Sequence, residues 1–209
     1  YNSIWGRDYG AETMYKNEVD SLYLMDWIYN RPRPLDDVMP EAIADFMGLP
    51  IFTATQAPYD VVHTGGNFMA DGCGTAFSSY LVYDENGPSG DYNQTVKTQA
   101  QLDDLMEQWM GISQYITMPT LQYDAIHHID MHMKLLDEER LLVGEFPVGV
   151  SDGPQIEINL NSYVNGHNSV FGEPFKLIRI PMPPSTGGQY PPNGSYRTYA
   201  NNIFLNKLV

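Results

Sequence analysis

The hexapeptide HHIDMH, which begins at His127, places three histidines and one aspartate within six positions. These residue types could hold a metal ion, form an acid–base pair, or belong to a polar strand without a chemical role. If residues 125–135 form a strand, the side chains of His128, Asp130 and His132 share one face. His127 then lies on the other face among apolar neighbours, and we predict that it is a packing histidine.

A metal site within this segment is hard to build. Successive same-face residues of a strand lie about 6.5 Å apart, so His128, Asp130 and His132 could not bind one ion without further ligands. The remaining histidines, His63 and His167, lack metal-ligand spacing. The pattern favours a general acid–base histidine, His128, beside the carboxylate of Asp130. A metal-dependent hydrolase and a polar strand without function remain alternatives, and we predict no metal and no cofactor.

Three amphipathic helices are expected to position these side chains, at residues 35–48, 99–111 and 152–166. Thr98 and Gln101 are typical of a capping box for the second helix, and Asp152 is the expected cap of the third. The predicted apolar faces are Met39, Ile43, Phe46 and Met47 in the first helix, Leu102, Leu105, Met106, Trp109 and Met110 in the second, and Ile156, Leu160, Tyr163 and Val164 in the third.

Each helix lies within a repeat of about sixty residues. β-Prone segments precede the helices at 21–30, 77–85 and 140–148, and a glycine followed by a short apolar strand comes after each one. The three glycines are Gly48, Gly111 and Gly172, separated by 63 and 61 residues. This periodicity predicts an α/β protein built as a propeller, array or solenoid.

The repeat also relates segments with unusual polar residues. Gly65 follows Gly48 by seventeen positions, and His128 follows Gly111 by seventeen. In the third repeat the corresponding segment is YANN at 199–202, after a proline- and glycine-rich insertion. Equivalent positions of a radially repeated fold converge near its axis. We therefore expect these segments to share one site.

Composition limits the classes of partner. The chain has 209 residues, 26 acidic and 11 basic side chains, and a formal charge of −15. This charge disfavours nucleic acid and anionic membranes and suits cationic ligands, although it could serve solubility alone. A single cysteine excludes a disulfide framework and a multi-cysteine zinc site. The sequence contains no run of about 20 apolar residues, so it predicts no membrane-spanning helix.

Five motifs carry a family resemblance: SIWGRDYG, DWIYNRPRP, GGNFMADGCGTAFSS, HHIDMHMKLLDEERLLVGE and YANNIFLNKLV, in this order. Together they resemble the agmatine deiminase and bacterial, Porphyromonas-type peptidylarginine deiminase family of guanidine-modifying enzymes. The resemblance implies a pentein-type propeller of five α/β units. About three units would lie in residues 1–209, as a single catalytic domain truncated at both ends.

The resemblance also implies a reaction and its residues. A guanidinium of agmatine or of a C-terminal peptidylarginine would be hydrolysed to a ureido product and ammonia through a covalent cysteine intermediate. Asp8 and Asp130 would hold the planar cation by charge-assisted hydrogen bonds, and His128 would act as general acid and base. The implied pocket residues are Trp5, which would stack on the substrate, Gly65, Gly66 and Asn67, where the backbone would pass close to it, and Asn201, as an amide.

Arg31 and Arg33 bear on the substrate. Prolines at positions 32 and 34 stiffen the segment, and alternate residues of an extended chain point the same way. Two such arginines suit the carboxylate of a C-terminal arginine, which agmatine lacks. Surface ion pairs with Asp36 and Asp37 are the alternative.

The nucleophilic cysteine of the family lies near the end of its domain, so we expect it beyond Val209. Cys73, in DGCGT, does not match that position and is predicted to be structural. The expected partner is a small-molecule or peptide guanidinium, with no nucleic acid or membrane. The oligomeric state is open, and a secreted or periplasmic location is favoured over a cytoplasmic one. An inactive guanidinium-binding module is a further alternative.

Overall fold

The computed structural model describes residues 1–16 and 19–203 and divides the chain into two compact units. The first unit consists of Tyr1–Asn67 and Leu81–Gly111. The second consists of Phe68–Tyr80 and the residues from Ile112 onward. None of the described helices is long and apolar enough to span a membrane.

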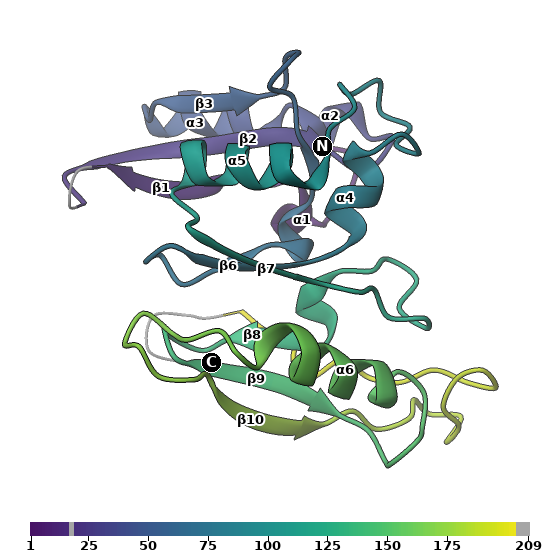
Figure 1. Cartoon of the computed structure of the whole chain (residues 1–209). Helices are drawn as coiled ribbons and strands as arrows, with labels where there is room; N and C mark the ends of the chain where they lie inside the picture. The colour runs from purple at the N-terminus through teal and green to yellow at the C-terminus, as the bar shows by residue number, and fades with distance from the viewer. Residues whose placement is uncertain (17–18, 204–209) are drawn as a thin grey trace. The chain divides into compact units, whose positions relative to one another are not determined.

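The first unit is a mixed sheet with helices on both faces (Figure 1). In its sheet β2 is central, with β1 antiparallel on one side and β3 parallel on the other, while the short β4 also pairs with β2. The elements of this unit are α1 (Gly6–Tyr9), β1 (Glu12–Lys16), β2 (Ser21–Tyr29), α2 (Pro34–Asp37), α3 (Met39–Met47), β3 (Ile51–Ala54), β4 (Val62–His63), the 3-10 turn η1 (Gly65–Asn67), α4 (Leu81–Asn86) and α5 (Gln99–Met110).

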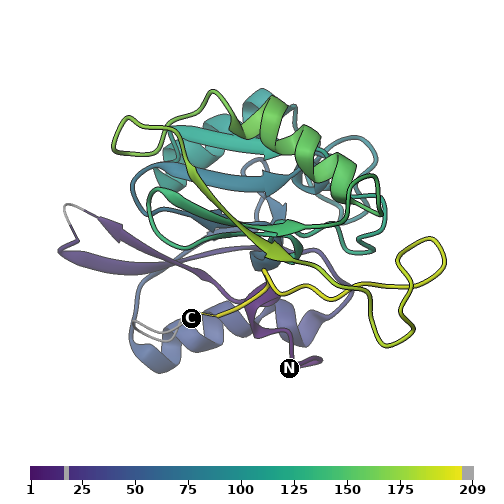
Figure 2. The ribbon, with the colours of Figure 1, turned by 90° about the horizontal axis from the view of Figure 1, so that it is seen from below.

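The second unit contains two three-stranded sheets, ordered β5-β6-β7 and β8-β9-β10. After β10 the chain leaves the sheet as a long loop, drawn in yellow in Figure 2. The elements are β5 (Met69–Ala70), β6 (Thr75–Ser79), β7 (Gln114–Met118), the 3-10 turn η2 (Ile129–Met131), β8 (Met133–Leu135), β9 (Arg140–Glu145), α6 (Gly153–Asn159), the π-helical turn η3 (Leu160–Val164) and β10 (Lys176–Pro181).

The predicted sixty-residue repeat is confirmed. Each of the three sheets has a central strand, β2, β6 or β9, that pairs antiparallel with the strand before it. Each central strand also pairs parallel with β3, β7 or β10, which the chain reaches through α3, α5 or α6. A parallel neighbour requires such a crossover.

A helical turn precedes the first strand of every repeat, namely α1 before β1, η1 before β5 and η2 before β8. These turns contain Asp8, Asn67 and Asp130. The sequence relation between Gly65 and His128 therefore corresponds to a structural one, since Gly65 begins η1 and His128 caps η2.

Helix α5 forms as its sequence predicts. The Thr98 hydroxyl accepts a hydrogen bond from the Gln101 backbone N–H, and Oε1 of Gln101 accepts one from the Thr98 backbone N–H. Gly111 ends the helix with φ of +68°. Four of the five predicted apolar side chains are buried and Trp109 is half-buried. α6 and η3 likewise bury Ile156, Leu160 and Val164.

The first helix differs from its prediction. Residues 35–48 form two short helices, α2 and α3, and the latter ends at Gly48 in the left-handed conformation. The buried residues of α3 are Pro40 and Ala44, whereas Phe46 is 91% exposed. The expected apolar face was therefore wrong for Phe46 and Met47, which are exposed, while Met39 and Ile43 are half-buried.

Two segments expected to be strands contain helical turns. The β-prone segment 77–85 continues as a strand only to Ser79 and then becomes α4, in which Val82 is fully buried. The segment 125–135 has strand geometry only from Met133. Tertiary burial overrides the intrinsic preference in the first case, and the η2 turn interrupts the strand in the second.

Candidate active site

The alternation predicted for His127 to His132 is wrong, because η2 turns the chain. The amide of Met131 donates to the His128 carbonyl at 3.3 Å, and that of His132 donates to the Ile129 carbonyl at 3.3 Å. As a result His128, Ile129 and His132 are buried, while Asp130 between them is half-buried. A 3-10 turn with a period of three replaces the two-residue period of a strand.

His127 is not the packing histidine that the strand interpretation predicts. It is half-buried, its φ is +58°, and its Nδ1 lies 3.1 Å from the carbonyl oxygen of Leu121. His132, by contrast, is buried, with 2% of its surface exposed. Burial lowers the pKa of His132 to about 4, so this imidazole is neutral at pH 7.

His128 and Asp130 stand at the start of the same turn. His128 is 3% exposed and occupies the residue before η2 in an extended conformation, and Asp130 lies within the turn. The side-chain amide of Asn201 lies 3.7 Å from Sδ of Met131, the next residue of η2. The second unit therefore brings three of the predicted site residues to one turn. The other predicted site residues belong to the first unit.

In the first unit, Asp8 lies where α1 meets η1. Its carboxylate accepts a hydrogen bond from the backbone N–H of Gly66, and its carbonyl accepts one from the Thr64 hydroxyl at 3.3 Å. A Cβ at Gly65 would lie 2.0 Å from the carbonyl oxygen of Arg7, so only glycine fits there. Gly65 thus lets the backbone of α1 approach closely, and the predicted approach of this backbone to a substrate stays a prediction.

The electrostatic surroundings of Asp8 are cationic. Burial raises the pKa of the Asp8 carboxyl, and this effect is opposed by Arg31, Arg7, the Gly66 N–H and Arg33. Since Arg31 and Arg33 both act on Asp8, the first unit brings together three of the predicted site residues. Asn67, a fourth, is fully buried in η1.

The two arginines are held by neutral acceptors. Nη1 of Arg31 donates to the Asn30 carbonyl at 2.7 Å. Nη1 of Arg33 donates to the Tyr29 hydroxyl at 3.1 Å and to Oγ of Ser3 at 3.4 Å. Both side chains are half-buried and keep further N–H groups for other partners.

The alternative that pairs these arginines with Asp36 and Asp37 is wrong. Asp36 is fully buried and accepts hydrogen bonds from the Asn2 and Ser3 amides and the Ser3 hydroxyl. Asp37 accepts the Tyr29 amide at 2.7 Å. Within residues 1–16 and 19–203, no ion pair links either aspartate to Arg31 or Arg33.

Trp5 is 54% exposed at the residue before α1, so the alternative of a core tryptophan is wrong for this chain. An exposed indole can stack on a cation or on an alkyl stem. Its predicted place in a substrate pocket stays a prediction.

The metal alternative lacks a ligand cluster. Among the residues that the structure describes, no three His, Cys, Asp or Glu side chains gather closely enough to hold a metal ion.

Cys73 is exposed, and its amide donates to Oδ1 of Asp71 at 2.7 Å. Desolvation and the negative charges of Asp71 and Glu138 raise the pKa of the Cys73 thiol. A raised pKa disfavours the thiolate that a nucleophile needs.

A set of polar residues beside Arg31 was not anticipated. The Asn30 amide donates to both carboxylate oxygens of Glu85, at 2.8 and 3.1 Å, and the Tyr92 hydroxyl donates to the Asn30 carbonyl at 2.9 Å. Burial raises the pKa of Glu85 to about 7. A helical interpretation of residues 81–86 would have indicated Glu85, because it lies three positions from the apolar Val82.

The three repeated sheets, each preceded by a helical turn with a polar residue, form a mixed α/β fold that matches solved agmatine deiminases. A C. jejuni agmatine deiminase matches 99% of the chain with a TM-score of 0.71 and 21% identity. A cysteine-to-serine variant of a C. jejuni agmatine deiminase with substrate bound also matches 99%, with a TM-score of 0.72 and 20% identity. A Porphyromonas gingivalis protein described as an arginine deiminase matches 98%, with a TM-score of 0.76 and 17% identity.

The chain belongs to the Porphyromonas-type peptidyl-arginine deiminase family, whose sequence model matches residues 1–209. It spans 56%, 59% and 60% of the lengths of the three solved structures. The family resemblance of the five sequence motifs is thereby confirmed.

Proposed function

We propose that the whole protein hydrolyses a guanidinium group to a ureido product and ammonia through a covalent cysteine intermediate. The observation that carries this proposal is the repeated helical turn, which holds Asp8 in α1 and Asp130, next to His128, in η2. Membership of the peptidyl-arginine deiminase family supports it. The substrate-bound cysteine-to-serine variant among the matched structures is consistent with a cysteine nucleophile in that relative.

The chemistry assigns distinct tasks to these side chains. A guanidinium is planar and delocalised, so two carboxylates can fix its plane by paired N–H···O bonds. Asp8 and Asp130 perform this task in the proposal. A bound cation next to Asp8 would also favour its ionised form, against the burial that raises its pKa.

The covalent steps need a thiolate and one proton carrier. The thiolate adds to the guanidinium carbon, and the C–N bond breaks as ammonia leaves with a proton from His128. His128 then takes a proton from water, whose oxygen attacks the same carbon. The C–S bond breaks as the hydroxyl group formed from this water loses its proton to solvent, which releases the ureido product and restores the thiolate. The nucleophilic cysteine is expected beyond Val209.

For the substrate, we favour an arginine with a free carboxylate over agmatine. Arg31 and Arg33 lie on the same unit as Asp8, whereas Asp36 and Asp37 accept hydrogen bonds from other groups. Two arginines close to the guanidinium-binding carboxylate suit an α-carboxylate, for which agmatine has no counterpart. A peptide-directed enzyme suits an exported location, which cell fractionation would test.

The test uses the whole protein with agmatine, free arginine and a peptide ending in arginine, and measures both ammonia and the ureido product. We expect His128→Ala to lower kcat by about 10²–10⁴-fold, because general acid–base catalysis contributes on this scale. His127→Ala is the matched control and should retain activity, since the His127 ring contacts the Leu121 carbonyl. Absence of product from every substrate, with binding retained, would instead identify a guanidinium-binding module.

A further inference from the structure

Arg31 is supported by a group of buried and half-buried residues, which we call the Arg31 cluster: Asn30, Arg31, Glu85 and Tyr92. The Asn30 carbonyl is its centre, because it accepts hydrogen bonds from Arg31 Nη1 at 2.7 Å and from the Tyr92 hydroxyl at 2.9 Å. Arg31 also lies near enough to Tyr92 and Glu85 to lower the pKa of each against the burial that raises it.

Asn30 cannot turn away from this arrangement without a penalty. It is 1% exposed, and its amide nitrogen donates to both carboxylate oxygens of Glu85, which is 9% exposed. Rotation of the Asn30 side chain would break the hydrogen bonds between its buried amide N–H and the buried Glu85 carboxylate. Glu85 therefore keeps the residue whose carbonyl receives Arg31 in one orientation.

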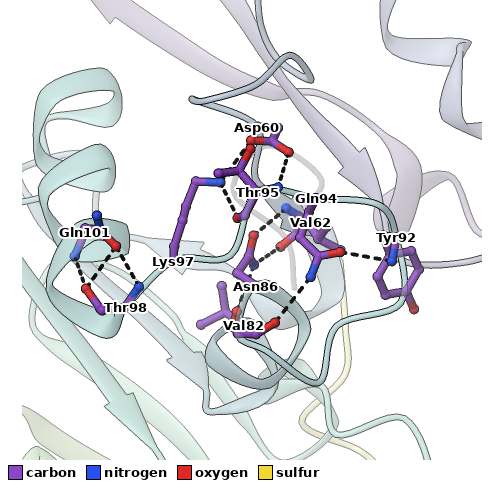
Figure 3. A network of polar contacts seen from close by, with 11 residues as sticks. Asp60, Val62, Val82, Asn86, Tyr92, Gln94, Thr95, Lys97, Thr98 and Gln101 are labelled. Atoms are coloured by element: carbon purple, nitrogen blue, oxygen red, sulfur yellow. Dashed lines mark hydrogen bonds and ion pairs between the residues drawn. The ribbon is translucent and has the colours of Figure 1, made fainter.

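The loop that carries Tyr92 is itself held down by buried polar contacts (Figure 3). Nζ of Lys97 lies 3.0 Å from Oδ1 of Asp60, and both side chains are about 95% buried. Oδ2 of Asp60 accepts the Thr95 amide at 2.6 Å, and the Lys97 amide donates to the Asn86 carbonyl at 2.9 Å.

Asn86 extends this anchorage to β4. Its side chain accepts the Val62 amide at 2.9 Å and donates to the Val62 carbonyl at 2.7 Å. Closer to the cluster, the Gln94 side chain accepts the Tyr92 amide at 3.0 Å (Figure 3). The loop is thus fixed on both sides of Tyr92.

We propose that Tyr92 and Glu85 are positioning residues that act through Asn30 to hold the Arg31 guanidinium ready for the carboxylate of the substrate. This inference rests on the proposed function and extends it, because it assigns selectivity for a free carboxylate to the 87–98 loop as well as to the arginines. A free arginine side chain loses rotamer freedom when it binds a ligand, and an arginine already fixed loses less.

The experiment measures equilibrium binding, so that turnover does not enter it. The whole protein with His128→Ala is titrated calorimetrically with Nα-benzoylarginine, which has a free carboxylate, and with Nα-benzoylargininamide, which has none. Tyr92→Phe is added to this background. Tyr83→Phe is the matched control, because its hydroxyl donates to Asp103 at 2.9 Å, a partner in the same unit but outside the Arg31 cluster.

We expect Tyr92→Phe to raise the Kd of Nα-benzoylarginine about tenfold and to leave the Kd of the amide within about twofold. Glu85→Gln, which keeps one acceptor for Asn30, should raise the Kd of the acid by a smaller factor, again with no change for the amide. Tyr83→Phe should change neither Kd.

An equal loss of affinity for both ligands would mean a merely structural role and would overturn the inference. An unchanged Kd for both ligands would overturn it too. So would the absence of Nα-benzoylarginine binding by the His128→Ala protein. The same preparation without His128→Ala is assayed for ureido product. If selective weakening occurs while no product forms, the proposed activity is wrong and the inference stands. If product forms and the weakening is unselective, the inference alone is wrong.

Discussion

At the scale of single residues, the local conformation of the backbone determines which side chains are available for chemistry. His128 and His132 are both buried, yet they differ because His128 leads into η2 and His132 follows it. Burial holds the pKa of His132 near 4, whereas the proposed proton carrier is His128. A histidine-rich segment is thus not one functional group.

Gly65 tests the contact between α1 and η1. Gly65→Ala would place a Cβ 2.0 Å from the Arg7 carbonyl oxygen, and the turn that holds Asp8 would have to move. We expect a loss of about 1–3 kcal/mol in the free energy of unfolding, as for other overpacked sites, measured by urea denaturation. Gly187→Ala is the control, because a Cβ at that position would have open space around it. Equal stability of the two variants would contradict the close approach.

At the scale of elements, the same arrangement of a central strand with one antiparallel and one parallel neighbour is used three times with different helices. α5 has a capping box and a left-handed glycine at its end, and it meets Phe52 of β3 through Trp109, with ring centroids 5.2 Å apart. α3 instead exposes Phe46 and Met47, which are 91% and 57% exposed. The repeat therefore specifies where a helix occurs, whereas the side chains of each helix specify which of its faces is buried.

The capping box of α5 should contribute measurable stability. Thr98→Ala removes the hydroxyl that accepts the Gln101 amide at 3.3 Å, and we expect a loss of about 1 kcal/mol in the free energy of unfolding. Thr98→Ser keeps the hydroxyl and should restore most of this loss. Thermal unfolding followed by circular dichroism distinguishes the variants, and an unchanged Tm for Thr98→Ala would show that water replaces the cap.

At the scale of the whole molecule, an acidic chain with a formal charge of −15 also buries several carboxyl groups. Asp26 and Glu85 are 4% and 9% exposed, and burial raises the pKa of each to about 7. Asp36 and Asp60 have lowered pKa values, because hydrogen bonds and charges outweigh their desolvation. The two classes of carboxyl group affect stability in different pH ranges.

Asp26 should make stability fall as the pH rises. Its pKa is about 7 in the folded protein and 3.8 in the reference state, so the folded state binds more protons between these values. The stability it provides is complete below about pH 4 and is lost as the pH approaches 7. His132 acts in the opposite direction between about pH 4 and its ordinary pKa of 6.5, because its folded-state pKa is lowered.

The measurement therefore compares the free energy of unfolding of the unchanged protein with that of the Asp26→Asn variant. Because His132 is present in both proteins, its contribution cancels in the difference. Between pH 5 and 7.5 the difference in their free energies of unfolding should shift by about 2 kcal/mol in favour of the variant. A pH-independent difference would mean that Asp26 titrates alike in the folded and unfolded states.

The amino-acid sequence by itself determined the sixty-residue repeat of strand, helix and strand, the three left-handed glycines that follow the helices, the capping box at Thr98 and the motifs of the family. These features depend on residues near one another in the chain, through periodicity and local hydrogen bonds. The candidate residues Asp8, His128 and Asp130 also came from motifs.

Only the tertiary structure decided which polar side chains are buried. It turned residues 129–131 into η2, buried His132 and left His127 half-buried, exposed Phe46, and joined Asn30 to Glu85 across 55 positions of sequence. Burial and long-range hydrogen bonds depend on neighbours that are distant in the chain, and periodicity within a segment carries no information about them.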